Sequence, residues 1–335
     1  MLPAFFQVKN SPHCRQCDAP EHCASVPSRV SAPGAPSPNV VAMGMGISMA
    51  MRDFLMSRRA RLTPEAAGIA AQGRRRVPGL RREEVAELAG VSTEYYVQIE
   101  RGRLHGISGE VLDRIAVALQ LCEVECQHFA NLARNLRGTR VARPLPLEFR
   151  VPPGIQTLMD LSSRTASVVM TPRLELIASN RLGRALFAPI LDPRDPKPNL
   201  AAFVFLDERS RQFFTVWEAA ADSTAALLLL EWGRSPHDPL LGALIDRLRE
   251  QSSEFERRWT AHAVVSNIRD AQRFQHPELG DLDLQFETLE IPSSQGLVML
   301  NFFAAPDDPA AEQLRRLGTT KAPAEAGAGG ADFGI

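Results

Sequence analysis

Between Thr93 and Arg101 the chain carries hydrogen-bonding side chains at close spacing. Gln98 can bond to two edge atoms of adenine, and Glu94 can accept a hydrogen bond from the amino group of cytosine. Thr93 and Tyr95 can contact bases or phosphates, and Arg101 has a permanent positive charge suited to a phosphate. This chemistry is that of reading base-pair edges, and it requires an element that presents these side chains on one face.

The residues from Leu80 to Gly102 predict two short helices joined by a tight corner. We expect a first helix from 81 to 89 with Val85, Leu88 and Ala89 on its apolar face. Gly90 then stands where a helix ends in a left-handed residue, a conformation that glycine adopts at little cost. Val91 is expected to fill the corner between the two helices.

The second helix is expected from 92 to 101, with Ser92 as its N-cap and Glu94 placed favourably in its first turn. Tyr96 and Ile99 should face inward and Gly102 should end the helix. The side chains left outward are Thr93, Glu94, Tyr95, Val97 and Gln98. Two helices in this order form a helix-turn-helix, whose second helix can enter the major groove of DNA.

The sequence around this unit is basic. Nine arginines and two acidic residues lie between Arg52 and Arg82, although the whole chain has a net charge of −1. Such a segment is typical of a phosphate-binding surface. We predict phosphate contacts from Arg81, Arg82 and Arg101, and backbone or minor-groove contacts from an arm formed by Arg74, Arg75 and Arg76. The alternatives are a solvated charged face and a compact helical bundle with no role in DNA binding.

The chain has 335 residues, of which 44% are hydrophobic and 23% charged, so we expect two globular domains with tails. The expected parts are a disordered extension at 1–50, a helix-turn-helix domain at 51–137, a linker at 138–153, a ligand-binding domain at 154–317 and a disordered tail at 318–335. Met43, Met45, Met49 and Met51 lie at the first boundary, so the natural start codon is hypothesised to lie here.

Hydrophobic periodicity assigns the two domains to different fold classes. The first domain is expected to be all-α, with helices at 52–61, 81–89, 92–101, 108–121 and 123–136. The second domain is expected to be α+β with a small antiparallel sheet. Its strands are expected at 167–170, 174–178, 272–276, 281–289 and 296–304, and its helices at 180–187, 210–232, 238–251 and 253–263.

The helix-turn-helix segment resembles the Xre, lambda-repressor-like class. The run from Val77 to Val85, the run from Ala89 to Ser92 and the pair Tyr95-Tyr96 are similar to regulators of the MmyB-like family. The resemblance extends from about Met51 to Leu317 through five further segments: 179–181, 199–201, 205–207, 255–259 and 273–277. The chain departs from the family at Ser179, where members usually have Trp.

The resemblance implies that residues 150–317 form a PAS-like domain that holds a small apolar ligand such as a fatty acid. The aromatic residues assigned to that ligand are Phe203, Phe205, Trp217, Trp259 and Phe302. The composition itself leaves a second interpretation open. These rings, with Phe213, Phe214 and Phe286, can instead form an ordinary core, and composition does not reveal a cavity.

The remaining reactive side chains do not predict catalysis. His237, His262 and His276 are scattered, with no nucleophile or acid–base pair beside them, so we predict no enzyme. Cys14 and Cys17 have zinc-like spacing, near His13, His22 and Cys23, but a second such pair is missing. We therefore predict no metal and no cofactor, and we expect Cys122 and Cys126 to be packing residues.

The sequence contains no run of about 18 apolar residues and no signal-peptide pattern, so we expect a cytoplasmic protein without a membrane partner. Three functions stay open: a ligand-responsive DNA-binding regulator, a protein-interaction module that does not bind specific DNA, and an enzyme with an appended helix-turn-helix. The first explains most of the residues, and the symmetry of DNA half-sites favours a homodimer.

Overall fold

The computed structural model describes residues 38–69, 79–104, 106–137, 145–191, 195–262, 271–294 and 296–319, with side chains from Gly46 to Gly318. The predicted arm at Arg74, Arg75 and Arg76 lies outside the described residues. The same holds for the cysteine and histidine pattern before residue 24.

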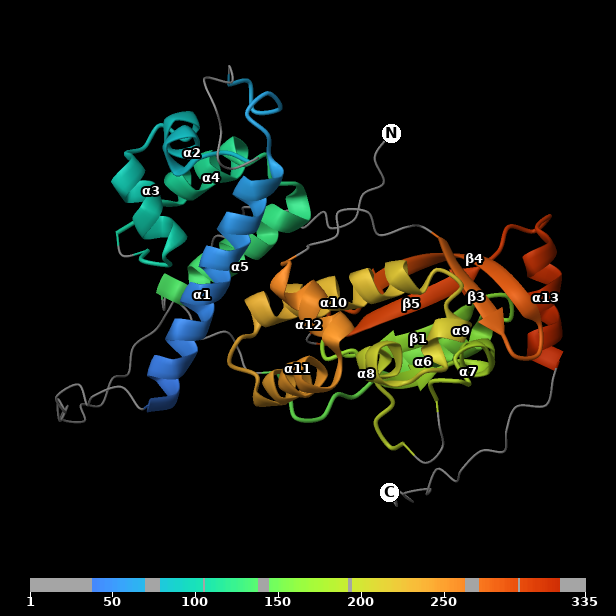
Figure 1. Ribbon diagram of the computed structural model, residues 1–335. Helices are drawn as coiled ribbons and strands as arrows, with labels where there is room; N and C mark the ends of the chain where they lie inside the picture. The colour runs from blue at the N-terminus through green and yellow to red at the C-terminus, as the bar shows by residue number, and fades with distance from the viewer. Residues whose placement is uncertain are drawn as a thin grey trace, which may run out of the picture. The chain divides into compact units, whose positions relative to one another are not determined.

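The first domain is all-α, as predicted (Figure 1). Its helices are α1 (Pro38–Arg61), α2 (Arg82–Leu88), α3 (Thr93–Glu100), α4 (Gly109–Ala118) and α5 (Glu123–Arg137). They enclose one apolar core whose largest fully buried side chains include Phe54, Tyr96, Ile99, Ile115 and Phe129. A core packed from all five helices fixes α2 and α3 relative to each other.

Helix α1 begins well before the boundary expected at residue 50. Ile47 and Ala50 are buried in the core of the first domain, together with Met51 and Phe54. These four residues recur at spacings of three, one and three, which places them on one face of a helix. The expectation of disorder up to residue 50 is therefore wrong from Pro38 onward, because it rested on the Pro, Ser, Ala and Gly content of the segment.

The second domain contains the predicted small antiparallel sheet. Its strands are β1 (Ala166–Met170), β2 (Leu176–Ser179), β3 (Ala271–His276), β4 (Gly280–Glu290) and β5 (Val298–Phe303). They lie in the order β2-β1-β5-β4-β3, and every neighbouring pair is antiparallel. Phe286 pairs with Phe302, and Phe274 with Leu282, so the aromatic side chains gather on one face.

Eight helices are described around this sheet: α6 (Pro153–Leu161), α7 (Arg181–Leu186), α8 (Leu200–Leu206), α9 (Ser210–Phe213), α10 (Trp217–Arg234), α11 (Pro239–Gln251), α12 (Ser253–Thr260) and α13 (Pro309–Thr319). The main core lies between helices α7 to α13 and the aromatic face of the sheet. Helix α6 packs on the opposite face, where Met159 contacts a small cluster that includes Val169 and Leu297. Helices α6, α8 and α13 were not predicted.

The long helix predicted at 210–232 is wrong, because the chain leaves helical geometry between Phe213 and Trp217. At this break Phe214 forms an isolated antiparallel bridge with Phe274, and the Thr215 N–H donates to the Arg273 carbonyl at 3.3 Å. The break therefore arises from pairing with β3, which a local helical pattern does not reveal.

Helix α10 also contacts the first domain. Leu229 of α10 is buried in the core cluster of the first domain. The Asn135 amide of α5 donates to the Gly233 carbonyl at 2.8 Å, and the Arg58 guanidinium of α1 donates to the His262 carbonyl at 2.6 Å. The two domains thus share side-chain contacts in addition to the connecting chain.

Candidate nucleic-acid interface

The corner between α2 and α3 has the geometry that the sequence predicted. Gly90 has a φ of 65°, in the left-handed region. The Ser92 hydroxyl accepts a hydrogen bond from the Tyr95 N–H at 3.1 Å and so caps α3. At the start of α2, the Glu84 carboxylate accepts from the Arg81 N–H at 2.7 Å. Both helix starts are thus satisfied by side chains, which fixes where each helix begins.

The inward faces of α2 and α3 agree with the prediction at all but one position. Tyr96 and Ile99 of α3 are fully buried, as is Val85 of α2. Leu88 was assigned to the apolar face of α2, but it is 41% exposed, and Ala86 is buried instead. A seven-residue helix has only two turns, so periodicity defines the orientation of its face poorly.

The outward face of α3 carries the residues predicted to read bases. Glu94 is exposed, while Thr93, Tyr95, Val97 and Gln98 are partly buried. The Gln98 amide oxygen accepts a hydrogen bond from Arg103 at 3.2 Å, which leaves the amide N–H₂ group of Gln98 free to donate. Tyr95 also packs against the core of the first domain, so the outward surface of α3 is formed mainly by Thr93, Glu94, Val97 and Gln98.

Arg82 was predicted to bind phosphate, but its guanidinium is joined to a carboxylate of the same domain. Its Nε donates to both oxygens of Glu100 at 3.2 and 3.1 Å, and an Nη donates at 2.9 Å. The Glu100 side chain is only 2% exposed, and the Arg59 Nε lies 3.7 Å from its Oε2. These hydrogen bonds to Glu100 raise the pKa of Arg82, so its charge is permanent.

Glu100 is a residue that the sequence reasoning missed. It lies four residues after Tyr96 and one after Ile99, on the inward side of α3. A carboxylate at a buried helical position requires a cationic partner, because an unpaired buried charge is costly. That requirement predicts a cationic partner for Glu100, although it does not identify Arg82 among the arginines of the domain.

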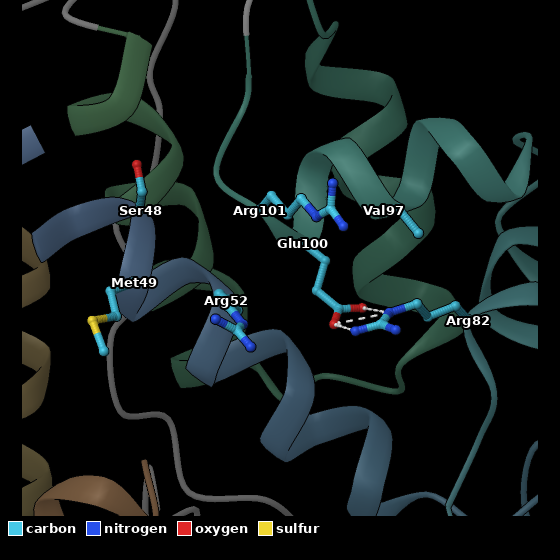
Figure 2. A pocket seen from close by; sticks show the side chains of 7 residues that line it. All are labelled: Ser48, Met49, Arg52, Arg82, Val97, Glu100 and Arg101. Atoms are coloured by element: carbon cyan, nitrogen blue, oxygen red, sulfur yellow. Dashed lines mark hydrogen bonds and ion pairs between the residues drawn. The ribbon is translucent and has the colours of Figure 1, made fainter. Parts of the chain in front are cut away.

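A hollow of about 410 Å³ opens beside α3 (Figure 2). Ser48, Met49 and Arg52 line it from α1. Its other walls are the Arg82–Glu100 pair, Val97 and Arg101. Val97 and Arg101 are four residues apart, so the hollow continues the outward face of α3. Arg101 is exposed, as a phosphate-binding residue must be.

The five aromatic residues assigned to a ligand lie within the second domain's aromatic packing. The ring centres of Phe203 and Phe213 lie 5.8 Å apart in an edge contact, and those of Phe302 and Phe274 lie 5.5 Å apart. Phe205 contacts Phe255 at 5.0 Å, and Trp259 stacks on the same ring at 5.5 Å. None of the five lines the hollow beside α3 or a second hollow whose lining residues include Phe149 and Leu297.

Trp217 is held more specifically than the other four. Its indole N–H donates to the Val204 carbonyl and to the Ser210 hydroxyl, both at 3.2 Å. The guanidinium groups of Arg211 and Arg258 lie 3.9 and 5.1 Å from its ring centre. These contacts satisfy the polar atom of the ring and stabilise its face by cation–π attraction.

The remaining candidates for metal binding or catalysis are histidine and cysteine side chains. Within the described ranges, no three His, Cys, Asp or Glu side chains are grouped to hold a metal ion. His276 bonds to the Ala185 carbonyl through Nε2, and its Nδ1 accepts from the Glu278 N–H, so this ring shapes a turn. Cys122 and Cys126 are free thiols. No helix in the part of the chain that the structure describes is long and apolar enough to cross a membrane.

Comparison with known families gives two matches. Residues 75–125 match the helix-turn-helix family, and residues 151–317 match the MmyB-like transcription regulator ligand binding domain. No curated protein matches the chain. The first match contains α2, α3 and α4, and the second contains the whole antiparallel sheet with α6 to α12. Both families are regulatory and neither is enzymatic.

Proposed function

We infer that α3 reads a specific DNA sequence in the major groove. The premise is that the chain is an Xre-type helix-turn-helix regulator with a C-terminal MmyB-like ligand-binding domain. The observation that carries this inference is the outward face of α3. Glu94 and Gln98 lie one turn apart on this face, between the capped start of the helix and Arg101. An acceptor and an amide at that spacing suit cytosine and adenine edges on neighbouring base pairs.

The test is selection of bound duplexes from random DNA with the full chain, repeated with Glu94→Ala and Gln98→Ala. Each variant is expected to lose the preference at one or two positions of the selected site, with a loss of about 1 to 3 kcal/mol for that base pair. Glu87→Ala is a matched control, since this exposed carboxylate lies on α2. Unchanged preferences in both α3 variants would contradict the inference.

The same selection distinguishes the protein-interaction alternative. A regulator that neutralises several phosphates loses affinity steeply as salt is raised. Wild-type chain that shows no salt-sensitive binding to any duplex would favour a helical domain that binds protein.

We further propose that the second domain binds a small apolar ligand that modulates DNA binding. The support is the family match over residues 151–317 and the aromatic residues that gather in this domain. Native mass spectrometry of the purified chain tests this, with a fatty acid as the first probe. A bound mass that also changes duplex affinity is the expected result. A saturating fatty acid that leaves both the mass and the duplex affinity unchanged would count against this ligand class.

Homodimer formation follows from the two-fold symmetry of the DNA sites that such helices usually read. Sedimentation with a selected duplex measures it directly. Two chains on a site with inverted half-sites are expected, and a single chain on one half-site would oppose the proposal.

A further inference from the structure

The N-terminal half of α1 lies directly against the end of α3. Gly102, with a φ of 73°, follows the C-cap of α3, and a Cβ at this position would stand 2.8 Å from the Cα of Ser48. Only glycine permits this approach. Because Ser48 and Arg52 are one helical turn apart, the contact also brings Arg52 to the hollow beside α3.

The charges around this hollow are unbalanced. Of its three arginines, Arg82 is committed to Glu100. Arg52 and Arg101 have no hydrogen-bond or ion-pair partner within the described residues, and both are exposed. In Figure 2 dashed lines join Arg82 to Glu100, whereas none reaches Arg52 or Arg101. The hollow therefore has two uncompensated positive charges, and the Ser48 hydroxyl lies at its edge.

We propose that Arg52 and Arg101 together bind one backbone phosphate of the duplex that α3 reads. This rests on the proposed function. The major groove is about 12 Å wide and a helix with side chains is about 10 to 12 Å across, so the phosphate strands border an inserted helix. Arg52 lies on the element that borders α3 at its C-terminal end. Two guanidinium groups on one phosphodiester anchor the helix in the groove without reading sequence.

The anion chemistry alone would also fit free phosphate, so the experiment separates the two sources. Duplex affinity is measured by fluorescence anisotropy over a range of salt concentrations for the full chain, Arg52→Gln, Arg101→Gln and the double variant. Arg164→Gln is the matched control, because Arg164 is an exposed arginine in the second domain. Thermal unfolding of each variant without DNA checks that the fold is intact.

Each single variant is expected to reduce the slope of log affinity against log salt by about 0.9, which is roughly tenfold in affinity at 0.1 M salt. The loss should be equal for selected and unrelated duplexes. Because both side chains hold the same phosphate, the double variant is expected to lose little more than either single one. Arg164→Gln should keep the wild-type slope.

Three results would overturn the proposal while leaving sequence reading by α3 intact. The first is Arg52→Gln behaving like Arg164→Gln. The second is a double variant that loses twice the slope, which would mean two separate phosphates. The third is inorganic phosphate that raises the melting temperature of the wild type but not of Arg52→Gln, with duplex affinity unaffected by the substitution. Wild-type chain without salt-sensitive duplex binding would instead contradict the proposed function itself.

Discussion

Arg82 and Glu100 join the first helix of the helix-turn-helix to the last turn of the second through three hydrogen bonds of 2.9 to 3.2 Å. The Arg82 side chain is 47% exposed and the Glu100 side chain is 2% exposed, so the pair extends from the core to the protein surface. The carboxylate also lies 3.7 Å from Arg59 of α1. One buried acidic group thus fixes the orientation of α3 against both α1 and α2.

Glu100→Gln is therefore expected to lower the free energy of unfolding by about 1 to 3 kcal/mol, because it leaves the Arg59 guanidinium without its counter-charge. Urea denaturation at pH 7 measures the loss. Glu83→Gln is the control, since that carboxylate is exposed and its partner among the described residues is Arg81. It should change stability by no more than about 0.5 kcal/mol. Equal losses in the two variants would show that burial of Glu100 contributes nothing.

Gly102 allows the prediction of a steric effect separately from a conformational one. Gly102→Ala and Gly90→Ala both place a side chain at positive φ, which costs about 1 to 2 kcal/mol. A Cβ at Gly90 has open space around it, whereas one at Gly102 would meet Ser48 at 2.8 Å. Thermal unfolding should therefore show an additional loss of about 1 to 3 kcal/mol for Gly102→Ala. Equal melting temperatures would mean that α1 moves away at no cost.

Sequence reasoning succeeded where structure is determined locally. The corner at Gly90, the cap at Ser92 and the burial of Tyr96 depend on neighbours within four residues, and all three were predicted. The pair of Arg82 and Glu100 joins residues eighteen positions apart, so no periodic pattern reveals it. For the same reason the arginines could be recognised as basic but not sorted into paired and unpaired ones.

In the second domain the strands were predicted and several helices were not. Alternating side chains along β4 identified a strand of the sheet, because one face of this strand is buried. Helices α6 and α13 begin at Pro153 and Pro309, residues that sequence reasoning treats as linker or turn signals although they suit a first helical turn. The break at Phe214 depends on contact with β3, which lies some sixty residues further along the chain.

Ser92 and Ser108 provide a paired test of how capping supports DNA recognition. Each hydroxyl caps a helix, accepting from the Tyr95 N–H at 3.1 Å and from the Val111 N–H at 3.4 Å, respectively. Each change to alanine is expected to cost about 1 kcal/mol of stability. Only Ser92→Ala should also weaken binding to a selected duplex, because it loosens the first turn of α3. A similar loss of duplex affinity in both variants would assign the effect to stability alone.

His128 of α5 is enclosed by apolar and cationic neighbours. It makes an edge contact with Phe54 at 5.1 Å, and a Cβ on Gly233 of α10 would lie 2.6 Å from its ring. Neither ring nitrogen has a hydrogen-bond partner among the described residues. Burial lowers the pKa of His128 to about 3, and the charges of His262 and Arg58 add to the effect. The ring is therefore neutral in the folded protein.

The sign of the resulting pH dependence follows from proton uptake. In the unfolded chain His128 binds a proton below about pH 6.5, whereas in the folded protein it does so only near pH 3. Stability should therefore be lost as pH falls between these values, at up to about 1.4 kcal/mol per pH unit from this residue.

His128→Leu removes the proton site and keeps an apolar side chain at a position where neither ring nitrogen has a hydrogen-bond partner among the described residues. Urea titrations from pH 8 to pH 4.5 should show a shallower loss in the variant. His262, whose pKa is also lowered by burial, titrates in both proteins, so the difference between the two slopes isolates His128. Parallel curves would show that His128 becomes protonated without opening its contact with α10.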